Sequence, residues 1–479
     1  MRRTRIVCTM GPASMRPAVL RRLIRSGMDV ARFNFSHGES GEQEQAVLLT
    51  RRLAGEAGRH VALLQDLQGP KIRTGSQPQG PIELRRGTRV RLYCATTTDP
   101  ARGISIDQPE LVRVLRPRDR VLIQDGEIQL RVLAGDGEEA SCQIVQGGLL
   151  RGRQGVIVPE RDLDLPALTE RDLTHLALGV ELGFDYLAIS FVSSAADVEG
   201  CRAELRRRGA STPIVAKLER ARALPRLDEI VESADAVMVA RGDLGVELPM
   251  AEVPAVQKNI IDRANRAGRP VITATEMLES MVHSGRPTRA EASDVANAIW
   301  DGSDAVMLSQ ETSIGDHPVL VLQAMDRICR AAERHPAYRR VRPSPRVRGT
   351  VSGAIAISAA GVAEEIGARA IVAFTESGAT ALRVSKARPR PPILAASPNA
   401  QTLRRTALLA GVVPLEVVAG RDTDDMIERA TAAARRSALV RPGDLIVIVA
   451  GTPVGESGRT NLVRVARVEP ASAGPDAVI

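Results

Sequence analysis

Short apolar runs of β-strand length alternate along much of the chain with longer segments whose apolar residues recur at helical spacing. Eight such runs occupy residues 6–10, 30–35, 61–67, 186–192, 213–219, 236–243, 270–276 and 305–311. Between two of them, Leu20, Leu23 and Ile24 mark one face of a predicted helix. Because apolar strands that alternate with helices favour parallel β/α architecture, the eight units predict a closed (β/α)8 barrel.

The alternation breaks in two places, which predicts two further domains. Period-two runs at residues 88–93, 120–123, 127–133 and 140–145 predict a small antiparallel β-barrel domain inserted after the third strand. Such a domain could close over a substrate and exclude water. A Pro- and Arg-rich linker at 335–348 precedes four runs of an open α/β domain. The predicted domains are therefore 1–69 with 165–340 (barrel), 70–164 (inserted domain) and 341–479 (C-terminal domain).

Composition narrows the class of protein without identifying it. In 479 residues, 44% hydrophobic and 25% charged content are ordinary for a globular chain. No apolar run approaches the roughly 20 residues that span a bilayer, so we expect a cytoplasmic protein without a membrane partner. The five cysteines are scattered, which indicates neither a zinc site nor a disulfide framework. The net charge of +8 comes with only 2% aromatics, which favours a phosphorylated metabolite over nucleic acid as ligand.

Charged side chains end two of the runs, at Lys217 with Glu219 and at Asp243. Two carboxylates that stay ionised side by side require a cation, and Mg²⁺, or Mn²⁺ in its place, suits oxygen ligands. A lysine beside that metal is suited to a phosphoryl group in transit. Lysine is also scarce, since only Lys71, Lys217, Lys258 and Lys386 occur among 65 basic residues. A structural ion pair is the alternative interpretation of these residues taken alone.

Other polar residues follow the same pattern, at the ends of runs where a (β/α)8 barrel places its chemistry. They are Arg32, Asn34, Asp66, Thr275 and Glu311. In the C-terminal domain, hydroxyls and a glycine precede a predicted helix at residues 374–381, which is typical either of an anion site or of a helix cap without a ligand.

Taken together and in order, these motifs resemble the pyruvate kinase family from Thr4 to about Val465. The matching blocks are residues 5–14, 32–38, 66–73, 215–219, 239–245, 273–281, 287–291, 304–309, 377–378 and 451–453. The resemblance implies a (β/α)8 barrel with an inserted β domain and a C-terminal regulatory domain. It also implies phosphoryl transfer from phosphoenolpyruvate to ADP, giving pyruvate and ATP, in a cytoplasmic homotetramer.

The resemblance also implies roles for individual residues. Glu219 and Asp243 would hold Mg²⁺, and Lys217 would neutralise the migrating phosphoryl group. Arg32 and Arg73 would grip phosphate oxygens, the Gly242 backbone would approach the substrate carboxylate, and Thr275 would help to protonate the enolate. The nucleotide would lie beside Asn34, Phe35, Ser36, His37 and Arg73, and a phosphorylated effector would bind Thr375, Ser377 and Thr380.

Five positions depart from the common family pattern. Leu67, Gln68 and Lys71 stand where many members have Thr, Lys and Glu, and those members bind K⁺ beside residues matching Asn34, Ser36 and Asp66. We expect Lys71 to place a built-in ammonium where that cation would sit, so that K⁺ is not required. The alternative is that Lys71 points to solvent. Gln154 replaces a common Lys, and Glu276 replaces a usual Gln beside Thr275.

Two other functions fit part of the pattern. A Mg²⁺-dependent aldolase or lyase acting on pyruvate-like enolates would use the same carboxylates, but it would need neither the two arginines nor the inserted domain. A catalytically inactive metabolite sensor would not need intact Lys217, Glu219, Asp243 and Thr275.

Overall fold

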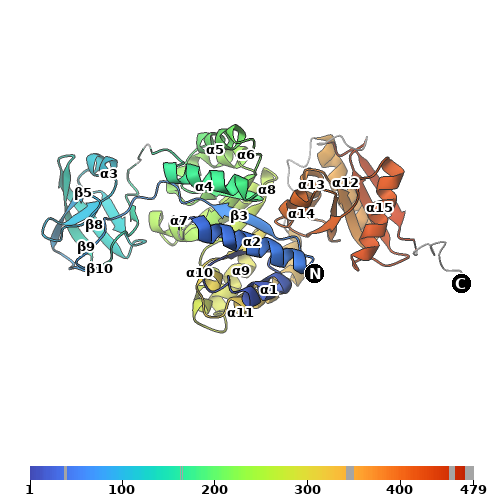
Figure 1. The fold of residues 1–479 in the computed structure, drawn as a ribbon, viewed down its shortest axis with the longest axis horizontal. Helices are drawn as coiled ribbons and strands as arrows, with labels where there is room; N and C mark the ends of the chain where they lie inside the picture. The colour runs from blue at the N-terminus through green and yellow to red at the C-terminus, as the bar shows by residue number, and fades with distance from the viewer. Residues whose placement is uncertain (37–39, 162, 164, 341–349, 453–458, 470–479) are drawn as a thin grey trace.

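The computed structural model describes residues 1–36, 40–161, 163, 165–340, 350–452 and 459–469. A central barrel lies between a smaller β domain on one side and an α/β domain on the other (Figure 1). The predicted fold class is confirmed by a closed barrel of eight parallel strands with an additional β domain and a C-terminal α/β domain. The limits predicted for the three domains stay predictions.

Each of the eight predicted runs overlaps one strand of the barrel. Around the barrel the order is β1 (Arg5–Thr9), β16 (Ala305–Leu308), β15 (Val271–Ala274), β14 (Ala236–Ala240), β13 (Ile214–Leu218), β12 (Tyr186–Ile189), β3 (Ala62–Asp66) and β2 (Val30–Asn34). The surrounding helices are α1 (Pro17–Ser26), α2 (Ser40–Glu56), α4 (Glu170–Glu181), α5 (Ala195–Arg207), α6 (Leu227–Ser233), α8 (Val253–Arg266), α9 (Arg289–Asp301) and α11 (Pro318–Arg334). Nearly continuous burial along the strands explains why they are apolar runs rather than alternating ones.

The interior of the barrel is filled by side chains from alternate positions. Val30, Leu64 and Val215 lie in one buried cluster, whereas neighbours such as Ala31, Leu63 and Ala216 lie in clusters under the helices. Because side chains alternate with a period of two along a strand, the residue two places after each inward residue also points into the barrel. That rule places the side chains of the last strand residues at the carboxyl-terminal end of the interior.

All eight predicted runs extend past the end of their strand, and two of them end in a helix instead. β14 stops at Ala240 and continues directly into α7 (Arg241–Glu247), so Asp243 lies in the first turn of a helix. β16 stops at Leu308 and is followed by α10 (Gln310–Ser313), which carries Glu311. A carboxylate in a first turn is favoured by the helix dipole, which explains why the acidic ends of these runs are helical.

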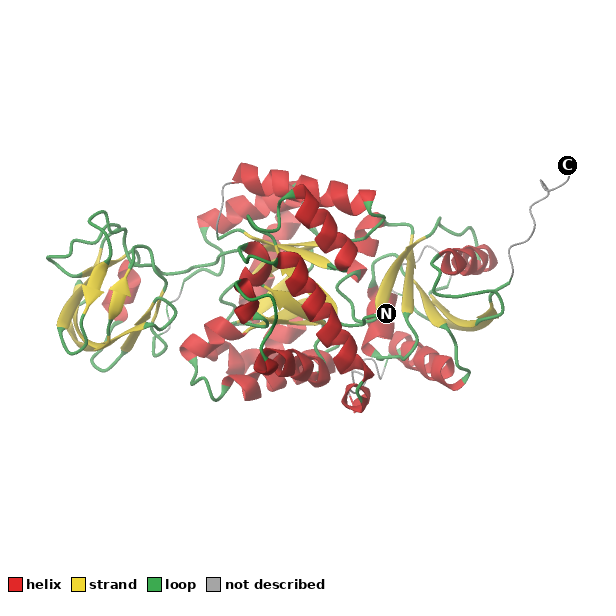
Figure 2. Ribbon diagram, turned by 90° about the horizontal axis from the view of Figure 1, so that it is seen from below, coloured by secondary structure: helices red, strands yellow, loops and turns green. Residues whose placement is uncertain are grey.

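The inserted domain carries a six-stranded sheet in the order β11 (Val156–Ile157), β7 (Arg120–Ile123), β8 (Ile128–Gly135), β9 (Glu139–Gln146), β5 (Arg89–Cys94) and β6 (Ile104–Ile106). A two-stranded sheet pairs β10 (Gly148–Leu150) with β4 (Ile82–Leu84), and α3 (Pro109–Val114) packs against β5 and β9 of the larger sheet. Two thin connections join this domain to the barrel (Figure 2). They pair with each other at Arg73 and Gly155, so entry and exit of the chain lie together. We call this domain the lid.

The C-terminal domain is a five-stranded sheet in the order β19 (Val412–Glu416), β18 (Ile393–Ser397), β17 (Ala370–Phe374), β20 (Leu445–Ala450) and β21 (Leu462–Arg467). Its helices are α12 (Val351–Glu365), α13 (Ala379–Lys386), α14 (Ala400–Thr406) and α15 (Thr423–Arg436). Three short 3-10 helices complete the assignment, η1 (Ala221–Arg226), η2 (Glu279–Val282) and η3 (Pro336–Arg340).

Buried polar contacts fix the C-terminal domain against the amino-terminal end of the barrel. Lys386 Nζ lies 2.6 Å from Asp304 Oδ2, and Tyr186 donates to the Arg405 carbonyl at 2.7 Å. The lid and the C-terminal domain therefore occupy opposite ends of the barrel (Figure 1).

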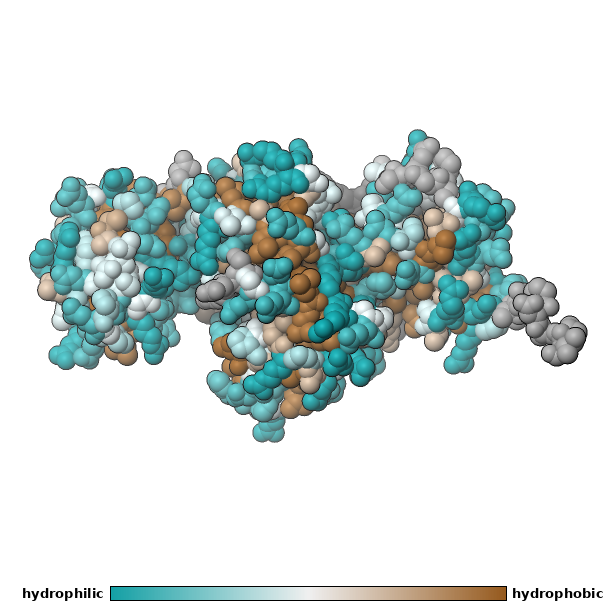
Figure 3. Space-filling model, viewed as in Figure 1, coloured by the Kyte–Doolittle hydropathy of each residue, from teal (hydrophilic) through white to brown (hydrophobic). Residues whose placement is uncertain are grey.

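The surface differs between the three parts. Figure 3 shows apolar residues gathered over the central barrel, whereas the lid face in this view is mainly polar. No helix in the described part of the chain has both the length and the apolar character needed to cross a membrane.

Candidate active site

Three charged side chains from strands β2, β3 and β13 meet at the carboxyl-terminal end of the barrel interior. Arg32, Asp66 and Lys217 each stand two residues after an inward apolar residue, so the strand period alone directs them to one place. Arg32 Nε lies 2.6 Å from Asp66 Oδ2, and Lys217 Nζ lies 3.3 Å from Asp66 Oδ1. The structure thus brings together three residues that are 34 or more positions apart in sequence.

The Lys217 ammonium lies among carboxylates rather than in solvent. Its Nζ is 3.3 Å from Glu219 Oε2 and donates a hydrogen bond to Ser190 Oγ at 2.7 Å. Burial alone would lower the pKa of Lys217, but Asp66, Glu219 and Asp243 outweigh burial and raise it. The amine therefore stays charged throughout the physiological pH range, as a group that neutralises a phosphoryl group must.

Glu219 follows β13 directly and is 2% exposed. It accepts a hydrogen bond from the Phe191 backbone N–H at 2.7 Å. Burial, together with the nearby Asp243 carboxylate, raises the pKa of Glu219 to about 7, even though Lys217 acts in the opposite direction. The charges of the protein alone thus do not offset the cost of burying the Glu219 carboxylate.

This donor set fits a hard divalent cation. Glu219 and Asp243 offer carboxylate oxygens only, and the shortage of positive charge between them is what a metal would correct. Within the described residues, no group of three or more His, Cys, Asp or Glu side chains could hold a metal. A Mg²⁺ ion at these two carboxylates would therefore need substrate or water oxygens to complete its coordination, as Mg²⁺ commonly does.

Thr275 and Gly242 face each other across the ends of β14 and β15. The Gly242 backbone N–H donates to Thr275 Oγ1 at 2.8 Å, and that hydroxyl donates to the Ala274 carbonyl at 2.7 Å. Thr275 has a positive φ of 65°, which a β-branched residue seldom adopts. Arg241 holds this backbone, because its guanidinium donates to the carbonyls of Ala274 at 3.2 Å and Thr275 at 2.7 Å.

Lys71 and Arg73 lie in the connection to the lid, and among the described residues no hydrogen bond or ion pair joins either of them to Lys217. The Lys71 side chain packs over Gly155, and no hydrogen bond or ion pair joins it to Asn34, Ser36 or Asp66 among the described residues. Arg73 donates from Nη1 to the Arg153 carbonyl at 3.1 Å. A narrow cavity between lid and barrel is lined by Lys71, Phe191, Arg220, Asp243 and Glu247 together with apolar lid residues.

The predicted nucleotide residues lie at the end of β2, but they differ in what they expose. Asn34 Oδ1 accepts from the Ser36 backbone N–H at 3.1 Å. The Phe35 side chain is 1% exposed and packs edge-on against Phe184, so in this conformation only its backbone could meet a nucleotide. His37 lies outside the described residues.

The predicted effector residues surround the start of α13. Thr375 Oγ1 accepts from the Gly378 backbone N–H at 2.8 Å, and Thr380 Oγ1 lies 2.9 Å from Thr460 Oγ1. Both hydroxyls are buried and already have partners within the chain, whereas Ser377 is exposed. The effector role of these three residues stays a prediction.

Sequence analysis missed three contributors to the site. Ser190 Oγ donates to the Leu67 carbonyl at 2.7 Å while it accepts from Lys217, and Thr9 Oγ1 accepts from Arg32 at 2.9 Å. Arg241 acts on backbone carbonyls, which leave no pattern in a sequence. Thr9 is the last residue of β1 and Ser190 directly follows β12, and this position at a strand end could have indicated that they belong to the site.

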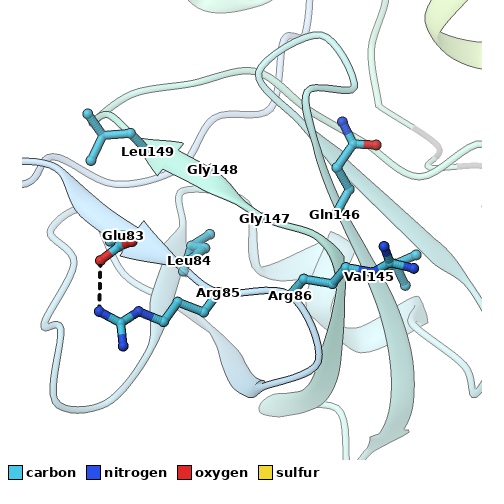
Figure 4. Close-up of a pocket in the computed structure, with 9 residues that line it drawn as sticks. All are labelled: Glu83, Leu84, Arg85, Arg86, Val145, Gln146, Gly147, Gly148 and Leu149. Carbon is cyan, nitrogen blue, oxygen red and sulfur yellow. Dashed lines mark hydrogen bonds and ion pairs between the residues drawn. The ribbon is translucent and has the colours of Figure 1, made fainter.

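A second hollow lies on the lid, remote from this chemistry. Figure 4 shows the residues that line it, which come from β4, β10, the end of β9 and the turns beside them; among these residues Glu83 and Arg85 pair at 3.1 Å. Its lining consists of residues 83–86 and 145–149, none of which was predicted to act in catalysis.

Comparison with known proteins addresses the family directly. A family model described as "Pyruvate kinase, barrel domain" matches residues 1–322, and "Pyruvate kinase, alpha/beta domain" matches residues 353–466. The chain belongs to the pyruvate kinase family. The resemblance drawn from the sequence motifs and the predicted enzyme class are therefore confirmed.

Relatives in this family align along nearly the whole chain. A pyruvate kinase of Corynebacterium glutamicum is 43% identical over 97% of this chain and 97% of its own length. One of Mycobacterium tuberculosis is 42% identical over 98% of each chain. One of Geobacillus stearothermophilus is 43% identical over 97% of this chain and 80% of its own length. Membership of this family removes the aldolase or lyase interpretation.

Proposed function

We propose that the protein transfers the phosphoryl group of phosphoenolpyruvate to ADP and produces pyruvate and ATP. The observation that carries this proposal is the buried Lys217 ammonium, held 3.3 Å from both Asp66 and Glu219 with Asp243 nearby. A fixed positive charge between a metal-type carboxylate pair and a buried arginine suits a phosphoryl group that carries spread negative charge.

Each side chain then has a defined task. Lys217 neutralises the phosphoryl group in transit, and Arg32 binds phosphate oxygens with the donors that its bonds to Asp66 and Thr9 leave free. Gly242 presents its backbone to the substrate carboxylate, since no side chain obstructs the approach. Thr275 holds the water that delivers a proton to the enolate carbon.

Glu219 and Asp243 would hold Mg²⁺, or Mn²⁺ in its place. When bound, the ion supplies divalent charge that polarises the enolate and carboxylate oxygens of the substrate. Asn34, Ser36 and the backbone of Phe35, with His37, form the proposed nucleotide side of the site.

Arg73 reaches the phosphate in this proposal only after the lid moves. Its guanidinium now bonds the Arg153 carbonyl in the lid connection, at 3.1 Å. Closure of the lid over the barrel end would bring Arg73 to the substrate and exclude water from the transfer.

We also propose that K⁺ is not required. Leu67 offers no oxygen ligand, and Lys71 carries a positive charge on the lid connection that closure could bring to the monovalent cation region of Asn34, Ser36 and Asp66. Equal turnover in K⁺-free and K⁺-containing buffer supports this proposal, and strict activation by K⁺ refutes it.

The proposal also covers an effector site in the C-terminal domain and the oligomeric state. A phosphorylated effector at Thr375, Ser377 and Thr380 requires that Thr375 and Thr380 exchange their internal partners for the ligand. We further propose a cytoplasmic homotetramer, which light scattering of the purified protein would test.

A coupled assay tests the reaction itself. Phosphoenolpyruvate, ADP and Mg²⁺ are supplied, and pyruvate is measured by its enzymatic reduction. Pyruvate formation that requires all three supports the proposal. No pyruvate at any metal concentration contradicts it and favours the alternative of an inactive metabolite sensor.

A further inference from the structure

Glu276 is an exposed acidic residue at the barrel end that the proposed mechanism does not use. It directly follows Thr275, and its carboxylate makes no hydrogen bond or ion pair with any described residue. Every other acidic residue placed in the site so far, Asp66, Glu219 or Asp243, has a partner or a proposed metal. An unpaired carboxylate beside a site for anions therefore calls for an explanation.

The backbone fixes the direction of this side chain. Thr275 and Glu276 have consecutive positive φ angles of 65° and 53°. Arg241 Nη2 donates to both of their carbonyls, at 2.7 Å and 3.2 Å. Because left-handed conformations of non-glycine residues persist only where the surroundings impose them, the position of Glu276 is set by this arginine.

The carboxylate is directed toward Gly242. A Cβ atom placed on Gly242 would lie 3.8 Å from Glu276 Oε1 and 3.5 Å from Thr275 Oγ1. The Thr275 hydroxyl already bonds the Gly242 N–H and the Ala274 carbonyl, and Glu276 takes no part in those bonds. Glu276 thus faces the place where the proposed function puts the substrate carboxylate, without contacting the group assigned to proton delivery.

We propose that Glu276 is a specificity-determining residue that opposes binding of the anionic substrate and thereby sets a high KM without entering the chemical step. This inference rests on the proposed function for the location of the substrate carboxylate. Like charges repel even where neither touches the other, and the repulsion is present when the substrate is bound and while it reacts. Its removal therefore improves binding uniformly, which lowers KM and leaves kcat unchanged.

The substitution Glu276→Gln tests this inference, because it removes the charge and keeps the shape. We expect KM for phosphoenolpyruvate to fall about three- to tenfold, the size of one charge acting over several ångströms in partly aqueous surroundings. The dissociation constant of oxalate, measured by calorimetry at saturating Mg²⁺, should fall by the same factor. Both ratios of wild type to variant should approach one as ionic strength rises, because salt screens exposed charges.

Glu252→Gln is the matched control, since Glu252 is an exposed glutamate at the start of α8. It should change neither constant. An unchanged or weaker oxalate affinity in Glu276→Gln overturns the inference, and so does a fall in kcat or a ratio that is insensitive to salt. The oxalate measurement needs no turnover, so a failure of the proposed function, seen as no pyruvate from the wild type, remains distinguishable.

Discussion

Replacing Lys217 by Met removes the charge that the account places beside the migrating phosphoryl group, while a side chain of similar length remains. The ammonium lies 3.3 Å from Asp66 and from Glu219, so the change breaks two buried pairs. Asp66 keeps Arg32 at 2.6 Å. Glu219 loses its ion-pair partner, but because its pKa is already about 7 it can take up a proton instead of remaining a buried, uncompensated charge.

We expect Lys217→Met to lower both the stability of the fold and kcat. Breaking a buried pair costs about 3–5 kcal/mol of stability, and protonation of Glu219 keeps the loss toward the lower value. Loss of one preorganised group that stabilises transition-state charge lowers kcat about 10²- to 10³-fold, or about 2.7–4 kcal/mol. A full charge lost from a buried site belongs at the upper end of that range.

The assay is pyruvate formation over a range of Mg²⁺ concentrations, with Mn²⁺ binding followed separately by electron paramagnetic resonance. Binding of Mn²⁺ should persist, because the ion displaces the proton that Glu219 takes up, Asp243 remains, and the competing ammonium is gone. Lys258→Met is the matched control, since Lys258 is exposed on α8 and pairs with Asp301 away from the site. Turnover of Lys217→Met within tenfold of the wild type would refute the assigned role.

Three further outcomes are expected. Ser190→Ala leaves the Leu67 carbonyl without its donor, so we expect a loss of about 1–3 kcal/mol in unfolding by denaturant, with a smaller fall in kcat than for Lys217→Met; a variant as stable as the wild type would contradict this. Arg32→Lys cannot reproduce the forked bonds to Asp66 and Thr9, so KM for phosphoenolpyruvate should rise at least about tenfold in steady-state kinetics, and an unchanged KM would exclude the phosphate contact. Burial lowers the pKa of Lys386 to about 8, so between pH 8 and the ordinary lysine value the unfolded chain binds more protons than the folded protein. The free energy of unfolding of the wild type, relative to that of Lys386→Met, should therefore rise with pH in that interval. A fall would show that the amine is not buried as described.

The sequence predicted the barrel well because its strands are buried on both faces, so each appears as an uninterrupted apolar run. It predicted the ends of the strands less well. The chain passes from β14 into α7 within one residue, and an apolar run that ends in an acidic residue does not show where strand gives way to helix. Asp243 was singled out as a candidate metal ligand, but it was placed on a strand, whereas it lies in the first turn of α7.

Charged members of the site were found because charge at the end of an apolar run is conspicuous. Ser190 and Arg241 were missed because they act through single hydroxyl and backbone contacts between segments that are distant in sequence. The sequence also could not predict the positions of Lys71 and Arg73, because these depend on the orientation of the lid relative to the barrel. Phe35 could not be placed fully either, because a sequence motif does not show that its side chain is buried and that only its backbone could meet a nucleotide.

In the proposed mechanism Glu219 and Asp243 share one divalent ion beside Lys217. Anomalous diffraction from crystals grown with Mn²⁺ and oxalate would locate that ion. We expect a Mn²⁺ peak bonded to both carboxylates, with oxalate completing the coordination and Lys217 facing the oxalate. A peak elsewhere, or one bonded to neither carboxylate, would refute the shared metal site.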